Sequence, residues 1–235
     1  MRIVVLISGG GSNLQSLLVR YHHSKSASGH QDASHCEGRG SDALYPDGQI
    51  VAVISNRPDA FGLSRARQAG VKALTLDHMG FADRAAFDQA LAGMIEALQP
   101  DLVVLAGFMR ILTDTFVQRF AGRMINIHPS LLPKYPGLNT HQRALEAGDA
   151  QAGATVHFVT AELDGGPAIA QLAIPINHND TADSLARKVL VQEHKLYPLV
   201  VEWFVKGRIK LEDNLAVLDG IPLPKSGCLL DTASL

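Results

Sequence analysis

Continuous apolar runs alternate with amphipathic segments along the first half of the chain. Five strands are predicted from these runs, at 3–7, 50–54, 73–76, 102–106 and 124–127. Between the strands, apolar residues recur at the spacing of one helix face. This pattern predicts helices over 14–21, 60–69, 87–98 and 114–120. Strands that alternate with helices predict an α/β fold, in which a Rossmann-like parallel sheet carries helices on both faces.

The pattern changes after His128, where three prolines and Gly137 predict a stiff loop over 129–137. Beyond it, 155–160 alternates as a half-exposed strand does, and 169–176 predicts another strand. A long helix is then predicted from 181 to 205, with a kink at Pro198. We therefore expect the parallel sheet of a first half, residues 1–120, to continue into a more antiparallel second half, residues 121–235.

One stretch, 22–49, does not fit either periodicity and is rich in Ser, Gly, His and Asp. We interpret it as a surface insertion in the first half. It holds four of the ten histidines and one of the two cysteines, namely His22, His23, His30, His35 and Cys36. These side chains could bind a metal, but a solvated loop offers no rigid element to fix the ligands, so no metal site is predicted.

Composition narrows the class of protein. The 235 residues are 46% hydrophobic and 19% charged, which is typical of a globular protein. A net charge of −2 leaves no basic excess for coating nucleic acid. The longest apolar run, 102–109, is far shorter than the ~20 residues that a bilayer requires. The apolar run 3–7 is shorter than the core of a secretory signal, so we expect none. Two cysteines form no disulfide framework, so we expect a cytoplasmic protein without membrane or nucleic-acid partners.

A glycine-rich loop, Ser8-Gly9-Gly10-Gly11-Ser12-Asn13, joins the first strand to the first helix. Backbone N–H groups at a helix N-terminus favour anions, and glycine lets a phosphate approach closely. The dinucleotide fingerprint fails because Leu14 stands at its third glycine, and no Gly-Lys-Ser/Thr triplet is present. The loop therefore predicts a phosphate site, with a plain tight turn as the alternative.

Asn126 and His128 lie at the carboxyl end of a predicted strand, where open α/β sheets bind ligands. Alternate residues of a strand share one face, so we expect both side chains in one crevice. An amide that polarises a carbonyl and an imidazole that stabilises an oxyanion suit acyl or formyl transfer. Asp164, in the turn 163–167, is the expected carboxylate partner of His128. Taken singly, each residue could equally be a structural one. We expect His141, His157 and His178 to be structural or surface residues.

Seven segments in the same order along the chain resemble the phosphoribosylglycinamide formyltransferases, the folate-dependent enzymes of purine synthesis. They are Ile7–Gln15, Ile54–Arg57, Leu105–Leu112, Asn126–Gly137, Val156–Val159, Leu163–Pro167 and Gln192–His194. The resemblance covers nearly the whole chain except 22–49 and the last dozen residues. The chain departs from the family in that insertion and at Gly10, where relatives often carry a larger residue.

The resemblance implies transfer of the formyl group of 10-formyltetrahydrofolate to the amine of glycinamide ribonucleotide, without a metal. It implies that residues 1–120 bind the nucleotide phosphate and that residues 121–235 bind the folate and carry a catalytic trio of Asn126, His128 and Asp164. The implied nucleotide contacts are Gly11, Ser12, Asn13 and Glu193. The implied folate contacts are Arg84, Met109, Arg110, Ile111, Leu112 and Asn126. A monomer or homodimer is expected, and a deformylase-like hydrolase or a non-catalytic nucleotide-binding module are the alternatives.

Overall fold

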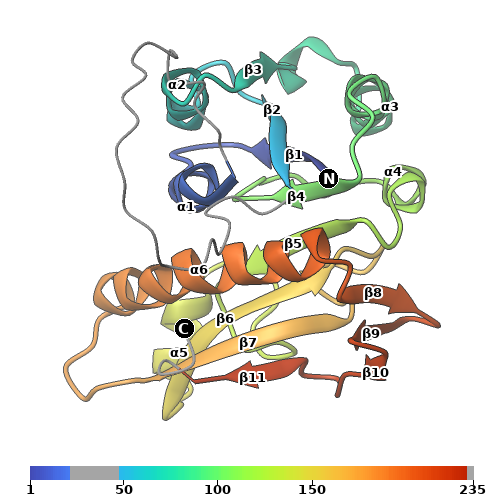
Figure 1. Cartoon of the computed structure of the whole chain (residues 1–235). Helices are drawn as coiled ribbons and strands as arrows, with labels where there is room; N and C mark the ends of the chain where they lie inside the picture. Colours follow the sequence, from blue (N-terminus) through green and yellow to red (C-terminus); the bar gives the residue numbers. More distant parts are fainter. Residues whose placement is uncertain (22–47, 232–235) are drawn as a thin grey trace, which may run out of the picture.

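The computed structural model describes residues 1–21 and 48–231, which form an α/β structure around one eight-stranded sheet (Figure 1). The strands follow the order β11-β7-β6-β5-β4-β1-β2-β3. Their bounds are β1 (Arg2–Ile7), β2 (Gln49–Ser55), β3 (Lys72–Thr75), β4 (Leu102–Leu105), β5 (Met124–His128), β6 (Gln151–Phe158), β7 (Ala168–Pro175) and β11 (Cys228–Leu230). A separate antiparallel sheet contains β8 (Ile209–Glu212), β9 (Leu215–Leu218) and β10 (Ile221–Pro222).

The direction of the strands confirms the predicted fold class. β1 to β5 pair in parallel, whereas β6 runs antiparallel to both β5 and β7. The order of the first five strands places a topological switch between β1 and β4, since β1 leads to β2 on one side and the chain later returns to β4 on the other. Open sheets of this kind bind ligands beyond the carboxyl ends of the strands at that point.

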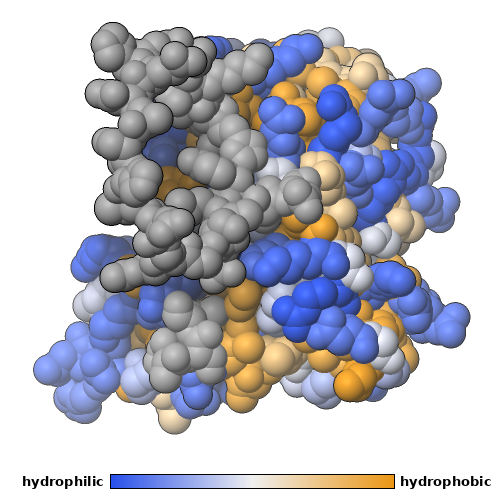
Figure 2. Space-filling model, in the orientation of Figure 1, coloured by the Kyte–Doolittle hydropathy of each residue, from blue (hydrophilic) through white to orange (hydrophobic). Residues whose placement is uncertain are grey.

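Six α-helices accompany the described strands: α1 (Ser12–Tyr21), α2 (Phe61–Gln68), α3 (Arg84–Glu96), α4 (Asp114–Arg119), α5 (Thr140–Glu146) and α6 (Ala182–Val205). One apolar core joins the sheet to α1, α2 and α6, and a second core joins the opposite face to α3 and α4 (Figure 1). The outer face of the C-terminal part of α6 is hydrophilic (Figure 2). Sheet residues buried on both faces explain the continuous apolar runs in the sequence.

Two expectations from the sequence need correction. β6 begins at Gln151 and all its later residues are buried, because α6 packs on one face and the segment 130–132 covers the other, so it is not half exposed. Gln49 belongs to β2, so the predicted insertion ends before it; residues 22–47 lie outside the described part.

The helix predicted over 181–205 is present and continues through Pro198. Within the described residues, no helix is long and apolar enough to cross a membrane.

Candidate active site

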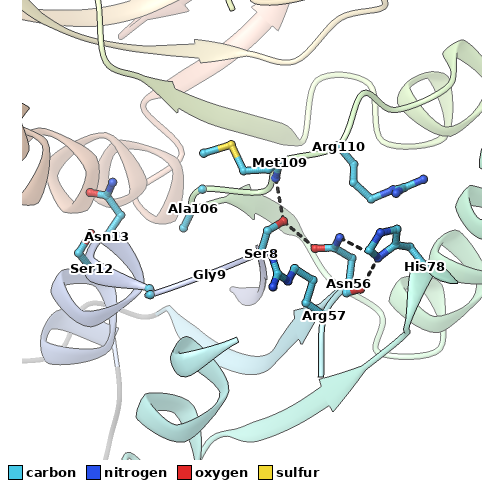
Figure 3. A pocket seen from close by; sticks show the side chains of 13 residues that line it. Ser8, Gly9, Ser12, Asn13, Asn56, Arg57, His78, Ala106, Met109 and Arg110 are labelled. Carbon is cyan, nitrogen blue, oxygen red and sulfur yellow. Dashed lines mark hydrogen bonds between the residues drawn. The ribbon is translucent and has the colours of Figure 1, made fainter. Parts of the chain in front are cut away.

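A cavity of about 510 Å³ lies at the carboxyl ends of β1, β2 and β4, where the fold predicts a ligand (Figure 3). The glycine-rich loop that follows β1 forms one wall. Gly11 has a φ of +69°, and a Cβ built on it would lie 2.8 Å from the backbone Cα of Gly62. Only glycine therefore fits this position, and it brings the loop close to α2 while α1 starts at Ser12. The first N–H groups of α1 have no partner within the helix and can bind an anion.

Asn13 and Glu193 meet at the junction of α1 and α6, although 180 residues separate them. The Asn13 side-chain N–H donates to Glu193 Oε2 at 2.7 Å. Burial raises the pKa of the Glu193 carboxyl, and the bond from Asn13 opposes that rise. Asn13 Oδ1 is buried and has no partner among the described residues, so this amide retains an acceptor that a ligand could use. The structure thus brings two of the predicted nucleotide contacts together.

Ser8, the first residue of the glycine-rich loop, is hydrogen-bonded to polar groups after β2 and β4 that the sequence analysis did not single out (Figure 3). The Ser8 hydroxyl donates to Asn56 Oδ1 at 2.6 Å and accepts the Met109 backbone N–H at 2.8 Å. His78 lies beside Asn56, with Nδ1 at 2.9 Å from its backbone carbonyl. Ser8 and Asn56 each follow a strand, and the parallel pairing of β1 with β2 brings the two strand ends together. Their place just after two predicted strands was the feature of the sequence that could have identified Ser8 and Asn56 as site residues.

A second cavity of about 100 Å³ adjoins the first across the segment 109–112. Asn126, Asp164 and three residues of that segment line it, namely Arg110, Ile111 and Leu112. Arg110 borders both cavities, and its buried Nε has no partner within the described chain. Met109 lines the first cavity, whereas Arg84, the first residue of α3, lines neither of the two.

Asn126, His128 and Asp164 are linked by contacts that also include His157. His128 Nδ1 lies 3.4 Å from Asp164 Oδ2, and His157 Nε2 lies 3.8 Å from Asp164 Oδ1. Asn126 Nδ2 lies 3.3 Å from His157 Nε2. Antiparallel pairing places Asn126 directly opposite His157, so the strand register, not the sequence, brings His157 into this group. We expected His157 to be a structural or surface residue; its burial excludes the surface alternative, and its contacts place it beside Asn126 and Asp164.

The hydrogen bonds define the state of the His157 ring. Its Nδ1 lies 2.8 Å from the Phe158 carbonyl, which can only accept, so Nδ1 carries a proton. Burial lowers the pKa of His157, although the Phe158 bond opposes that effect, and the ring is therefore neutral with a lone pair on Nε2. Nε2 accepts from the Asn126 amide, which turns the amide nitrogen toward His157 and fixes the orientation of the side chain.

His128 lies deeper than Asn126, and both of its nitrogens face protein groups. Nε2 donates to the Tyr135 carbonyl at 2.8 Å, while Nδ1 faces Asp164. Asp164 adopts a left-handed conformation with a φ of 51°, and its Oδ2 also accepts the Gly137 N–H at 2.9 Å. The Asp164 turn and the loop 129–137 are thereby tied to one another around His128.

Comparisons with known proteins identify the family. Residues 1–201 match the family model described as formyl transferase. The chain belongs to the formyl transferase family. It is 49% identical over 231 residues to phosphoribosylglycinamide formyltransferase of Escherichia coli (strain K12), covering 98% of this chain and 100% of that protein. The corresponding protein of Haemophilus influenzae is 46% identical and covers 96% of this chain and 97% of its own length.

A solved structure of another member is similar throughout. The phosphoribosylglycinamide formyltransferase of Coxiella burnetii, in complex with CHES, has a TM-score of 0.85 and 45% identity, covering 98% of this chain and 99% of that one. The family membership and the fold expected from the sequence are thus confirmed.

Proposed function

We propose that this protein transfers the formyl group of 10-formyltetrahydrofolate to the amine of glycinamide ribonucleotide. The products are formylglycinamide ribonucleotide and tetrahydrofolate, in de novo purine biosynthesis. The observation that carries the proposal is the linked group of Asn126, His157, Asp164 and His128 beside two adjoining cavities. The similarity to formyltransferases of the same name over nearly the full chain supports it.

In this proposal the larger cavity holds the nucleotide. Its phosphate is bound by the backbone N–H groups and the hydroxyl at the start of α1, from Gly11 to Asn13. Glu193, held by Asn13, is the acceptor for hydroxyl groups of the ribose. The unpartnered Asn13 Oδ1 within the described residues is consistent with a ligand that completes its hydrogen bonds.

The second cavity and the segment 109–112 receive the folate. Within the described residues, the backbone groups of Arg110, Ile111 and Leu112 have no hydrogen-bond partner, so they are available to a polar heterocycle. Arg110, with its unpartnered Nε, and Arg84 supply positive charge for the carboxylates of a folate. Arg84 and the segment 109–112 belong to the first half, so in this proposal that half contacts both ligands, while the second half supplies the catalytic trio.

The trio acts on the developing charge. As the amine nitrogen bonds to the formyl carbon, Asn126 donates from its amide to the formyl oxygen, which becomes an oxyanion. His128 donates from Nε2 to the same oxygen, which requires release of its bond to Tyr135. Asp164 holds Nδ1 and stabilises the charged imidazole. The bond from the formyl carbon to the folate nitrogen then breaks, and the proton lost by the amine is delivered to that nitrogen.

The deciding experiment measures release of tetrahydrofolate from 10-formyltetrahydrofolate with and without glycinamide ribonucleotide. We expect turnover only when the amine is present, with one formylated nucleotide formed for each tetrahydrofolate. Release at the same rate without the amine would instead identify a hydrolase. Binding of the nucleotide without turnover of the folate would identify a non-catalytic module.

A further inference from the structure

The segment Met109–Leu112, here named the strap, separates the two cavities without forming a helix or strand. It follows Gly107, which has a φ of +75°, and Met109 and Ile111 are 73% and 58% exposed. Its three last residues make no backbone hydrogen bonds within the described chain. A segment with so few internal bonds keeps a single conformation only if its surroundings hold it.

The first bond that holds the strap comes from Ser8, which is 7% exposed at the end of β1. The Ser8 oxygen accepts the Met109 N–H, the first backbone N–H of the strap (Figure 3). The single hydroxyl proton of Ser8 is donated to Asn56 Oδ1. Because Asn56 fixes that proton, the lone pairs of the hydroxyl remain directed at Met109.

The second bond comes from Asp88 of α3, and it holds the residue that follows the strap. Asp88 Oδ2 accepts the Thr113 backbone N–H at 2.6 Å. The residue is 2% exposed, and its Oδ1 is buried without a partner among the described residues. Burying a carboxylate costs several kcal/mol unless it is paired. An apolar side chain at this buried position of α3 would therefore stabilise the fold more, unless the bond to Thr113 has a role beyond stability.

Packing supports the same arrangement between the two bonds. Phe108 and Leu112 are buried in the core that α3 and α4 share. The Arg110 guanidinium lies over the ring of Phe87, next to Asp88 on α3, at 4.7 Å from its centroid. The exposed side of the strap therefore faces the cavities, while α3 and the end of β1 hold its other side.

We propose that Ser8 and Asp88 are positioning residues that hold the strap in the conformation that receives the folate co-substrate. This inference rests on the proposed function, because it assigns the strap to folate. Neither residue needs to touch the reacting atoms. If the strap occupies the competent conformation for only a fraction of the time, the apparent dissociation constant rises by the inverse of that fraction.

The test compares Asp88→Ala, which removes the acceptor, with Asp88→Asn, which keeps an oxygen for Thr113. Calorimetry with tetrahydrofolate, the folate product, gives the dissociation constant. We expect it to rise about tenfold in Asp88→Ala, as loss of a charged hydrogen bond would cause, and at most about threefold in Asp88→Asn. KM for glycinamide ribonucleotide should stay within about twofold, and hydrogen exchange should accelerate over 109–113 in Asp88→Ala.

The exposed residue Asp101 provides a control for loss of a carboxylate that accepts a backbone N–H. Its Oδ2 also accepts a backbone N–H at 2.6 Å, that of Arg2, but at the opposite end of the strands. Asp101→Ala should therefore leave the tetrahydrofolate affinity unchanged, whatever its effect on stability. Equal losses of tetrahydrofolate affinity in Asp101→Ala and Asp88→Ala would show general damage and overturn the inference. A rise in KM for glycinamide ribonucleotide as large as the rise in the tetrahydrofolate dissociation constant in Asp88→Ala would do the same.

Unchanged tetrahydrofolate affinity in a folded Asp88→Ala protein would also overturn it. If that variant does not fold, Ser8→Ala decides the question by the same calorimetric measurement, since it removes the acceptor of Met109. The proposed function is tested separately in the parent protein. A parent that neither binds tetrahydrofolate nor transfers formyl refutes that function, whereas an active parent with unaffected variants refutes only the positioning role.

Discussion

The His128 ring gives the sharpest prediction for a single residue. Its Nε2 bonds to the Tyr135 carbonyl and its Nδ1 faces Asp164, and the donation proposed to the formyl oxygen strengthens as negative charge develops on that oxygen in the transition state. His128→Ala should reduce turnover by roughly 10²- to 10⁴-fold, the range for a general acid–base group, with much smaller changes in KM. Steady-state kinetics with each substrate varied in turn provide the measurement. Turnover close to that of the parent would exclude His128 from the chemistry.

His157 makes stability depend on pH. Burial lowers its pKa in the folded protein below the ~6.5 of an unfolded chain. At a pH between the folded and the unfolded pKa, His157 is protonated in the unfolded chain but not in the folded protein. The stability present above pH ~6.5 is therefore lost as the pH falls toward the folded pKa. Urea unfolding at pH 7 and pH 5 should show the parent less stable at pH 5, and His157→Gln should show a smaller difference. A loss of stability between pH 7 and pH 5 that is equal in the parent and in His157→Gln would contradict this assignment. Burial also lowers the pKa values of His141 and His194, but these residues contribute to the loss in both proteins.

The sequence could predict some of these residues but not all of them. Asn126 and His128 are two positions apart on one strand, which was enough to place them together, and the turn chemistry of 163–167 singled out Asp164. His157 could not be found in this way, because its place opposite Asn126 depends on the register of β5 against β6. Asp88 escaped notice for a similar reason: its partner Thr113 is 25 residues away and contributes only its backbone.

At the scale of an element, the loop between β1 and α1 offers a matched pair of glycines. Gly11 has a positive φ and its Cβ would meet Gly62, whereas no atom lies within 4 Å of a Cβ on Gly10. Gly11→Ala should therefore lower the free energy of unfolding by roughly 1–3 kcal/mol and weaken nucleotide binding. Gly10→Ala should change both much less. Calorimetry with glycinamide ribonucleotide and thermal unfolding of both variants test this difference, and equal effects of the two substitutions would refute it.

The sequence predicted most elements of the first half, including the short β3 and α4, but it missed α5 and β8 to β11. The apolar runs of β1, β2 and β4 and the helix face of α1 appear in the structure nearly as predicted. The missed elements contain at most seven residues each, and, apart from the four residues of β9, no continuous apolar run of that length or clear helix face marks them. β8, β9 and β10 pair with their neighbours along the chain, whereas β11 pairs with the distant β7, a contact that local sequence does not encode.

At the scale of the whole molecule, the boundary between the two halves does not divide the core. β4 of the first half pairs with β5 of the second, so one sheet crosses the boundary. α6 of the second half packs against α1 of the first, where the Tyr21 hydroxyl donates to the Pro198 carbonyl at 2.9 Å. The Tyr197 hydroxyl on the same helix donates to the Leu105 carbonyl at 2.8 Å, at the end of β4. Contacts of this kind make each half depend on the other for burial of its apolar surface.

We therefore expect the protein to unfold in one cooperative step. Trp203 on α6 is the single tryptophan and is buried in the core shared with α1, so its fluorescence follows the second half. In a double variant, Trp203→Phe with Phe81→Trp, the probe follows the first half, because Phe81 packs against Phe87 of α3. Within each protein, the fluorescence and far-ultraviolet circular dichroism transitions in urea should have the same midpoint. Separate midpoints would show that the two halves unfold independently and that the continuous sheet does not couple them.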